Sequence, residues 1–239
     1  MFEELILVPY RNRKKQLDFF INNIVPMLNE LLPSSRVIIV EQTQEELFNR
    51  GALLNAGALI YAGKYKDIIT HDVDLYPKEH FVIKYYRYKF NGALGLCCSP
   101  CNTLGGVVKV PEKFFTQIGG FPNHFWGWGI EDKAFQNRIE IFNIPIQKIV
   151  LRNRPGFTEN FDFDEEKFES KKDSFRYLYN YRIQYEKWPT LSKARQMRII
   201  NNSGLNNLKF RVIRQNSYKD FDHCVIKLDR NFFQRIFSL

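Results

Sequence analysis

The chain has few cysteines and no long apolar run. Four of its 239 residues are cysteine, too few for a disulfide scaffold in a chain of this length. Cys97, Cys98 and Cys101 lie close together, but no second Cys/His pair follows at zinc spacing. We therefore expect buried thiols and not half of a zinc site. No apolar run reaches membrane-spanning length, and Met1 leads almost directly into the first apolar segment without a signal peptide.

The chain also lacks internal repeats and low-complexity linkers, so one domain is the simplest prediction. An apolar content of 44% and an aromatic content of 15% favour a packed globular core over disorder. The formal net charge of +9 predicts attraction to phosphate-bearing partners, which include a nucleotide, a nucleic acid and an anionic membrane. No aromatic-basic RNA motif or helix-turn-helix pattern supports a nucleic-acid partner.

The first third of the chain alternates strand and helix patterns. Short apolar runs at 5–8, 36–40 and 67–70 predict buried strands, and helical periodicity covers 14–32 and 46–61. This rhythm predicts an α/β fold with a mostly parallel central sheet flanked by helices. Ligands of such sheets gather beyond the carboxyl ends of the strands.

The rest of the chain completes the predicted domain and adds a tail. A helix is expected over 131–142 and a strand over 208–213. We assign residues 1–215 to the domain and 216–239 to a C-terminal tail. The tail ends in FFQRIFSL with arginines alongside. It is interpreted either as a helix packed on the domain or as a peripheral contact with an anionic membrane.

The segment FPNHFWGWGIEDKAF, at 121–135, combines aromatic, flexible and acidic residues. Tryptophan faces stack on sugars, glycines let the backbone approach a ligand, and a carboxylate can act as a general base. The alternative is that the tryptophans belong to the core and the acids open a helix. The residues concerned are Trp126, Gly127, Trp128, Gly129, Glu131 and Asp132.

Two carboxylates, Asp72 and Asp74, follow the third predicted strand in the motif HDVDLYP. Carboxylates one residue apart suit a hard divalent cation, which would stabilise a departing diphosphate. The alternative is a common strand-end cap. His71 precedes the pair and is interpreted as a packing or capping residue.

Basic and aromatic residues follow the first and second predicted strands. Together they suit a uridine ring and phosphates, whereas each alone would be an ordinary solvated turn. The residues are Pro9, Arg11, Arg13, Phe48 and Arg50.

Five of these blocks resemble the β-1,4-galactosyltransferase family in order and spacing. They are VPYRNR, FNRGALLNAG, HDVDLYP, the GGV turn and GFPNHFWGWGIED. The resemblance implies a GT-A, Rossmann-like fold. It also implies a UDP-sugar-dependent hexosyltransferase that inverts the anomeric centre, with UDP-galactose as donor, a glycan as acceptor and Mn²⁺ or Mg²⁺ as cofactor.

The resemblance also implies a role for each matched residue. Asp132 matches the catalytic base and Asp74 the direct metal ligand, with Asp72 as its D-x-D partner. The nucleotide and diphosphate set is Pro9, Arg11, Arg13, Phe48 and Arg50. The residues around the donor and its sugar are Gly105, Gly106, Trp128, which matches a loop that closes over the donor, and Glu131, a sugar-binding neighbour of the base.

The chain departs from the family pattern on the sugar side. Lys133 stands where the family has a third acidic residue, which suggests an acceptor that carries negative charge. Thr103 and Leu104 replace an aromatic pair that narrows the donor pocket, so UDP-GalNAc is a second candidate donor.

The chain also departs from the family at the metal. The family supplies a His, with a Met or second His, after the tryptophan segment, but residues 151–164 contain neither. Oxygen ligands from Glu159, Asp162 or Asp164 would suit Mg²⁺ or Mn²⁺, and arginines could replace the metal instead. The missing ligand leaves a catalytically degenerate glycan- or UDP-binding protein as the alternative function.

Location in the cell follows from the same resemblance. The family members lie in the Golgi lumen behind a membrane anchor and stem. The chain starts at its first predicted strand. We therefore expect a cytoplasmic bacterial or viral enzyme, or a domain excised from a Golgi enzyme.

Overall fold

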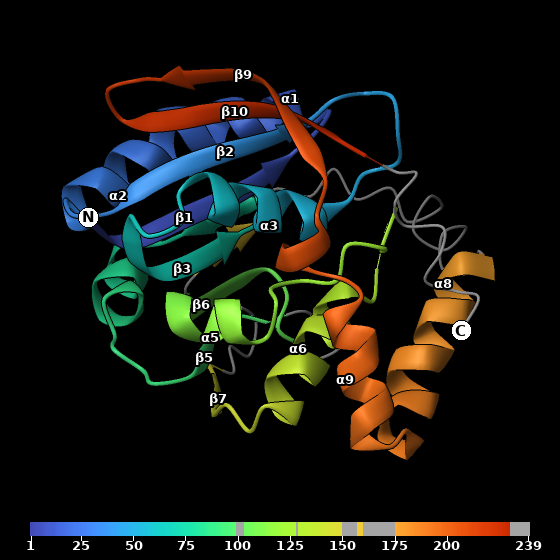
Figure 1. Ribbon diagram of the computed structural model, residues 1–239. Helices are drawn as coiled ribbons and strands as arrows, with labels where there is room; N and C mark the ends of the chain where they lie inside the picture. Colours follow the sequence, from blue (N-terminus) through green and yellow to red (C-terminus); the bar gives the residue numbers. More distant parts are fainter. Residues whose placement is uncertain (99–102, 128, 150–156, 160–174, 230–239) are drawn as a thin grey trace.

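A mixed β-sheet with helices on both sides forms the centre of the protein (Figure 1). The computed structural model describes residues 1–98, 103–127, 129–149, 157–159 and 175–229. Within these ranges, eight strands form one sheet in the order β7-β5-β6-β3-β1-β2-β10-β9, and β4 and β8 form a separate pair. The predicted α/β fold with a mostly parallel sheet is confirmed. The strands are β1 (Phe2–Tyr10), β2 (Arg36–Gln42), β3 (Tyr65–His71), β4 (Leu75–Pro77), β5 (Ala93–Cys97), β6 (Val107–Pro111), β7 (Ile146–Lys148), β8 (Phe157–Glu159), β9 (Phe210–Ser217) and β10 (Phe221–Leu228).

Helices connect the strands and cover both faces of the sheet (Figure 1). The predicted helix over 14–32 is present as one run in which a π-helical segment separates two α-helical ones. The helices are α1 (Lys14–Phe19), η1 (Phe20–Ile24), α2 (Val25–Leu31), α3 (Arg50–Ile60), α4 (Glu79–Phe81), η2 (Val82–Tyr86), α5 (Glu112–Gln117), α6 (Glu131–Ile141), α8 (Phe175–Tyr181), η3 (Arg182–Lys187), η4 (Trp188–Thr190), α9 (Lys193–Asn201) and η5 (Leu205–Asn207).

The helix predicted over 46–61 begins later than its apolar pattern indicates. α3 starts at Arg50 because Asn49 caps it: the Asn49 side-chain oxygen accepts a hydrogen bond from the Ala52 amide at 3.0 Å. The four residues before it form a loop at the carboxyl edge of the sheet. This start places the Arg50 side chain at the same edge.

The predicted C-terminal tail is wrong for the part that the structure describes. Residues 221–228 form β10, which pairs parallel with β2 inside the main sheet and antiparallel with β9. The predicted domain boundary at 215 falls within β9, and the strand predicted over 208–213 extends to Ser217. Residues 230–239, which carry the predicted membrane contact, lie outside the described residues.

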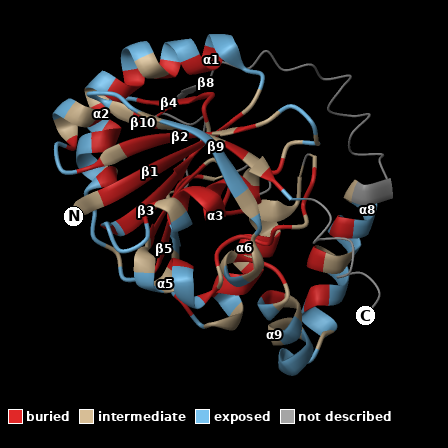
Figure 2. Cartoon of the chain, turned by 45° about the horizontal axis from the view of Figure 1, so that its top comes forward, coloured by how far each residue is buried: buried red, intermediate tan, exposed pale blue. Residues whose placement is uncertain are grey.

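Two apolar clusters sandwich the sheet, and its central strands are buried on both faces (Figure 2). Leu5 and Leu7 of β1 face the cluster beneath α3, whereas Ile6 and Val8 face the cluster beneath α1 and α2. Alternate side chains of a strand point to opposite faces, so a strand buried on both sides reads as a continuous apolar run. No helix within the described ranges is long and apolar enough to cross a membrane.

A helical hairpin of α8, η3 and α9 packs beside α6, away from the sheet (Figure 1). Asn137 of α6 donates from Nδ2 to the Gln184 carbonyl at 3.0 Å and to Gln184 Oε1 at 2.9 Å, and both residues are buried. Arg138, 2% exposed, donates to the carbonyls of Ile118, Gly119, Gly120 and Ser203. These bonds fix the hairpin and the preceding loop to α6.

Candidate active site

Arg50 joins two acidic groups that are far apart in the sequence. Its Nε donates to Asp72 Oδ1 at 2.7 Å and its Nη1 donates to Asp132 Oδ1 at 3.1 Å. Nη2 lies 3.4 Å from the Gly106 carbonyl oxygen. The start of α3, the end of β3, the glycine turn and the start of α6 therefore meet at one guanidinium. Burial alone would lower the pKa of Arg50, but the carboxylates of Asp72, Asp132 and Glu131 raise it above its ordinary value.

Asp132 lies against the backbone of Gly105. A Cβ on Gly105 would lie 2.7 Å from Asp132 Cγ, so only glycine admits the carboxylate at this place. Burial and the neighbouring charges of Glu131 and Asp72 raise the pKa of Asp132 well above the usual range, although Arg50 opposes the shift. A carboxylate with a raised pKa is a better proton acceptor, as a general base requires.

Glu131 opens α6 beside the candidate base. Burial raises the pKa of its carboxyl group, and Arg50 opposes the shift. Ile130, which precedes it, has φ +76°, an uncommon conformation for a β-branched residue. Backbone strain of this kind concentrates at functional sites.

Asp74 is paired with Arg13, from the loop that follows β1. Arg13 Nη1 donates to Asp74 Oδ2, and the Asp74 side chain is 10% exposed against 56% for Arg13. Burial and the Asp72 charge raise the pKa of Asp74, and Arg13 opposes the shift. The structure therefore brings Arg13 to the D-x-D motif, next to the place where a diphosphate is expected.

The donor set fits a cation that also binds phosphate. Asp72 and Asp74 supply carboxylate oxygens, and Mg²⁺ is commonly held by one or two carboxylates together with substrate phosphates. Among the described residues, no group of three or more His, Cys, Asp or Glu side chains gathers as a protein-only metal site would require. Glu159, in β8, is paired in register with Leu75, the residue after Asp74. Asp162 and Asp164 lie outside the described residues.

His71 is a buried, neutral support for this motif. A carbonyl only accepts, so His71 Nδ1 donates to the Asp72 carbonyl at 2.9 Å, and the Tyr86 hydroxyl donates to Nε2 at 2.9 Å. Burial lowers the pKa of His71 to about 4. The packing role predicted for His71 is confirmed.

Arg11 and Phe48 contact each other in the loops that follow β1 and β2. Arg11 Nη1 donates to the Glu46 carbonyl, and its guanidinium carbon lies 5.6 Å from the Phe48 ring centroid. The Gly127 amide donates to the Phe48 carbonyl at 2.7 Å, which joins this loop to the tryptophan segment. Pro9 lies buried at the end of β1, opposite Val40.

Trp126 is not available to stack on a sugar, although the sequence pattern suggests that role. Trp126 is 6% exposed and belongs to the apolar cluster beneath α3, so the core interpretation holds for Trp126. Trp128 lies outside the described residues. Leu104, one of the two residues expected to widen the donor pocket, is fully buried in the same cluster, and Thr103 is 6% exposed.

The cysteines follow the prediction where the structure describes them. Cys97 and Cys224 are buried free thiols and Cys98 is half-buried. Cys101 lies outside the described residues.

The sequence motifs did not reveal the asparagine network that holds the site together. Asn55 donates from Nδ2 to the Phe121 carbonyl and to Asn123 Oδ1, both at 2.7 Å. Asn49 donates to the Asn123 carbonyl at 2.7 Å, and Asn123 donates to the Gly204 carbonyl at 2.7 Å. All three asparagines are fully buried. The sequence offered one indication of this network: the asparagines of FNRGALLNAG and FPNH stand among apolar residues, at positions that face the core.

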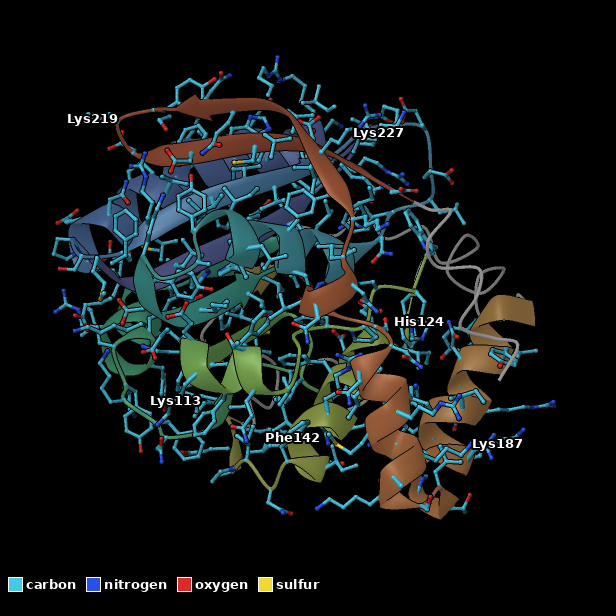
Figure 3. All side chains as sticks on the ribbon, viewed as in Figure 1. Lys113, His124, Phe142, Lys187, Lys219 and Lys227 are labelled. Atoms are coloured by element: carbon cyan, nitrogen blue, oxygen red, sulfur yellow. The ribbon has the colours of Figure 1, made fainter. Side chains whose placement is uncertain are left out.

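His124, two residues before Trp126, lies near the helical hairpin (Figure 3). Its Nδ1 is 3.1 Å from the Ser203 hydroxyl oxygen. Burial and the charge of Arg138 lower its pKa to about 3. His124 is therefore neutral and serves packing at neutral pH.

The sheet and its flanking helices have the GT-A fold of solved glycosyltransferase structures. A crystal structure of a Drosophila β-1,4-galactosyltransferase 7 mutant, in complex with manganese, UDP-Gal and xylobiose, matches the chain with a TM-score of 0.72. The sequence identity is 23%, and the match covers 96% of this chain and 95% of that chain.

Sequence comparison then gives the family. Residues 3–87 match the model of the N-terminal region of glycosyl transferase group 7, and residues 96–154 match the model described as the N-terminal domain of galactosyltransferase. The chain belongs to the β-1,4-galactosyltransferase family.

Two curated relatives illustrate the range of the family. β-1,4-galactosyltransferase 2 of Cricetulus griseus is 27% identical over 241 residues, which cover 94% of this chain and 59% of the relative. A β-N-acetyl-D-glucosaminide β-1,4-N-acetylglucosaminyl-transferase of Lymnaea stagnalis is 32% identical over 164 residues, which cover 61% of this chain and 32% of the relative. The chain spans less than two thirds of the length of either relative.

Proposed function

We propose that the chain is an inverting glycosyltransferase that moves galactose, or GalNAc, from a UDP-sugar to a hydroxyl group of a glycan acceptor. The observation that carries the proposal is the contact of Arg50 with both Asp72 and Asp132. Because Arg50 contacts both residues, the candidate base and the candidate diphosphate site lie close together. An inverting transfer needs this proximity, since the acceptor attacks as the diphosphate leaves in one step.

The acceptor hydroxyl would lose its proton to Asp132 as it attacks the anomeric carbon. The carboxylate is hydrogen-bonded by Arg50 and packs against the backbone of Gly105, so its orientation is restricted before the acceptor arrives. Its raised pKa makes it a stronger base than an exposed aspartate.

The departing UDP needs positive charge beside its phosphates. Arg50 and Arg13 lie at the edge where the diphosphate is expected, and Arg11 and Phe48 are placed to contact the nucleotide. Asp74, with Asp72, would hold Mn²⁺ or Mg²⁺, which when bound neutralises the charge that develops on the leaving diphosphate. The manganese and UDP-Gal of the Drosophila structure support this assignment.

The relatives leave more than one donor sugar open. Galactosyltransferases and an N-acetylglucosaminyl-transferase both occur among the relatives. Leu104 and Thr103 are both buried, so the proposal of a GalNAc donor depends on the smaller size of these two residues and not on an exposed contact.

The test is UDP release from UDP-Gal and from UDP-GalNAc, with a panel of sugar acceptors, in Mn²⁺ and in EDTA. Acceptor-dependent release that EDTA abolishes is the expected result. Asp132→Asn tests the base, because it should still bind UDP but form it from the donor about 10² to 10⁴ times more slowly. Release by Asp132→Asn at the wild-type rate would overturn the role of Asp132.

A catalytically degenerate UDP-binding protein is the second candidate. Both aspartates of the D-x-D motif are ion-paired with arginines, which favours binding without a metal. UDP binding that Mn²⁺ does not strengthen, with no release for any donor and acceptor, would support it. The cytoplasmic location finds no support in the relatives and stays a prediction.

A further inference from the structure

Three tyrosines form a stacked row on the helical hairpin. Tyr177 and Tyr181 have ring centroids 6.4 Å apart at 25°, and Tyr181 and Tyr185 have centroids 4.7 Å apart at 21°. The spacing of four residues places them on one side of the helical run. At a rise of about 1.5 Å per residue the row, here called the tyrosine ladder, is about 12 Å long.

The two ends of the tyrosine ladder contact residues that are close in sequence to the candidate base. A Cβ on Gly129 would lie 3.0 Å from a Tyr177 ring carbon, so Tyr177 packs against the tryptophan segment. At the other end, Lys133 Nζ lies 5.5 Å from the Tyr185 ring centroid. Lys133 directly follows Asp132, the candidate base. The ladder therefore contacts Gly129 and Lys133, which lie on either side of Asp132 in the sequence.

The ladder is held in place before any ligand arrives. The hydrogen bonds from Asn137 to Gln184 attach η3 to α6, and Trp188 at the end of η3 is 7% exposed. π-Helical segments such as η3 occur often at functional sites. The ring of Tyr181 is nevertheless open to solvent, with 39% of the residue exposed. Because the faces of the ring are turned toward Tyr177 and Tyr185, its exposed part is suited to contact a sugar from the ring edge.

The hairpin is strongly basic. Between 177 and 201 its only acidic residue is Glu186, and its five cations are all exposed (Figure 3 shows Lys187 at the outer rim). None of the five pairs with an acid among the described residues. The five are Arg182, Lys187, Lys193, Arg195 and Arg198.

We propose that the tyrosine ladder and Lys133, with the basic hairpin around them, bind the extended part of an acceptor glycan that carries negative charge. The inference rests on the proposed function and names its acceptor class. The exposed edges of the tyrosine rings would contact sugar rings, and the cations would pair with carboxylate, sulfate or phosphate groups on the same chain. The ladder is longer than one hexose, so the acceptor is an oligosaccharide or polysaccharide.

Direct binding tests the inference separately from catalysis. The probe is an oligosaccharide of alternating uronic acid and N-acetylhexosamine, and the comparison is the same oligosaccharide with its carboxylates reduced to alcohols. We expect at least about tenfold tighter binding of the charged form, with a steep loss of affinity as salt rises. A sugar phosphate and a sulfated oligosaccharide, measured in parallel, identify which anion is preferred.

Tyr181→Ala tests the ladder, and Tyr179→Ala is its matched control. The two tyrosines lie on the same helix and are almost equally exposed, at 39% and 38%. We expect Tyr181→Ala to weaken oligosaccharide binding about tenfold, while Tyr179→Ala and the thermal stability of both variants stay near wild type. In turnover, Tyr181→Ala should raise the KM for the long acceptor and leave kcat and the KM for the donor unchanged.

Three outcomes would overturn the inference. They are equal binding of the charged and reduced oligosaccharides, equal effects of the two alanine variants, and tighter binding of single-stranded polynucleotide than of any glycan through Tyr181. Loss of UDP release with ladder-dependent glycan binding intact would instead count against the transferase and leave the glycan site standing.

Discussion

Arg50 Nη1 lies 3.1 Å from Asp132 Oδ1, and the Nε of the same guanidinium lies 2.7 Å from Asp72 Oδ1. One arginine therefore separates, and holds, two carboxylates that would otherwise repel each other at a buried site. Its planar fork reaches both, which the single ammonium of lysine cannot do in the same geometry. The consequences can be tested at each partner.

Replacing Arg50 should damage both stability and activity. In Arg50→Met, Asp72 and Asp132 lose their shared counter-charge, so we expect a loss of about 3–5 kcal/mol in the free energy of unfolding and UDP release below detection. Arg50→Lys should recover part of the stability but little of the activity. Urea unfolding and UDP release measure the two effects. Arg87→Met, on the surface, is the control, and an active Arg50→Met enzyme would contradict the bridging role.

The pH dependence of turnover should reveal the base. Asp132 accepts a proton only when it is ionised, and its pKa is raised by burial and by Glu131 and Asp72. The value of kcat/KM should therefore rise with pH through an apparent pKa well above that of an ordinary aspartate, and level off beyond it. Asp132→Asn should lower kcat by about 10² to 10⁴. A profile that is already flat at the pKa of an exposed aspartate would contradict this assignment.

Gly105 should tolerate no side chain. The added Cβ of Gly105→Ala would overlap the Asp132 carboxylate and displace the base, so we expect kcat to fall at least about tenfold, because misplaced catalytic groups are costly. Gly63→Ala is the control: no atom lies within 4 Å of its Cβ, although its φ of +73° should cost about 1 kcal/mol of stability. Unchanged kcat in Gly105→Ala would show that Asp132 acts from another position.

Asp74 should control metal affinity. Asp74→Asn removes one charged oxygen ligand, and we expect at least about tenfold weaker binding of Mn²⁺ in the presence of UDP. Electron paramagnetic resonance of free Mn²⁺ gives the affinity without requiring turnover. Glu79→Gln, an exposed carboxylate shortly after the motif, should leave it unchanged. Equal Mn²⁺ affinity in Asp74→Asn and wild type would show that Asp74 is not a ligand of the metal.

Asp222 should make folding sensitive to acid. Burial raises its pKa, but hydrogen bonds from Arg36, Tyr61 and Ser217 outweigh burial and lower the pKa overall. A lowered native pKa adds stability above the unfolded-state pKa, and this stability is lost as pH falls through the native value. Asp222→Asn should therefore lower stability by about 1–3 kcal/mol at pH 7, with the difference from wild type shrinking in acid. The exposed Asp220→Asn should show no such pH-dependent difference.

Short-range patterns of the sequence determined the motifs and the type of most elements. The runs at 36–40 and 67–70 predicted buried strands, and HDVDLYP and WGWGIED placed the acids at an edge of the sheet. These features depend on neighbours within a few residues, because helix and strand periodicities are local. The acidic motifs and arginines of the site could be predicted from the chain alone.

Only the tertiary structure decided which segments meet. Residues 221–228 alternate between buried and half-buried positions, but Asp222 takes a buried position beside Arg36, so the strand lacked a clean apolar alternation. Its pairing with β2 depends on a partner about 180 residues away that no local pattern names. The burial of Trp126, the bridge made by Arg50 and the contact of Tyr177 with Gly129 have the same origin. Each depends on a neighbour brought close by long-range packing, which a local periodicity does not contain.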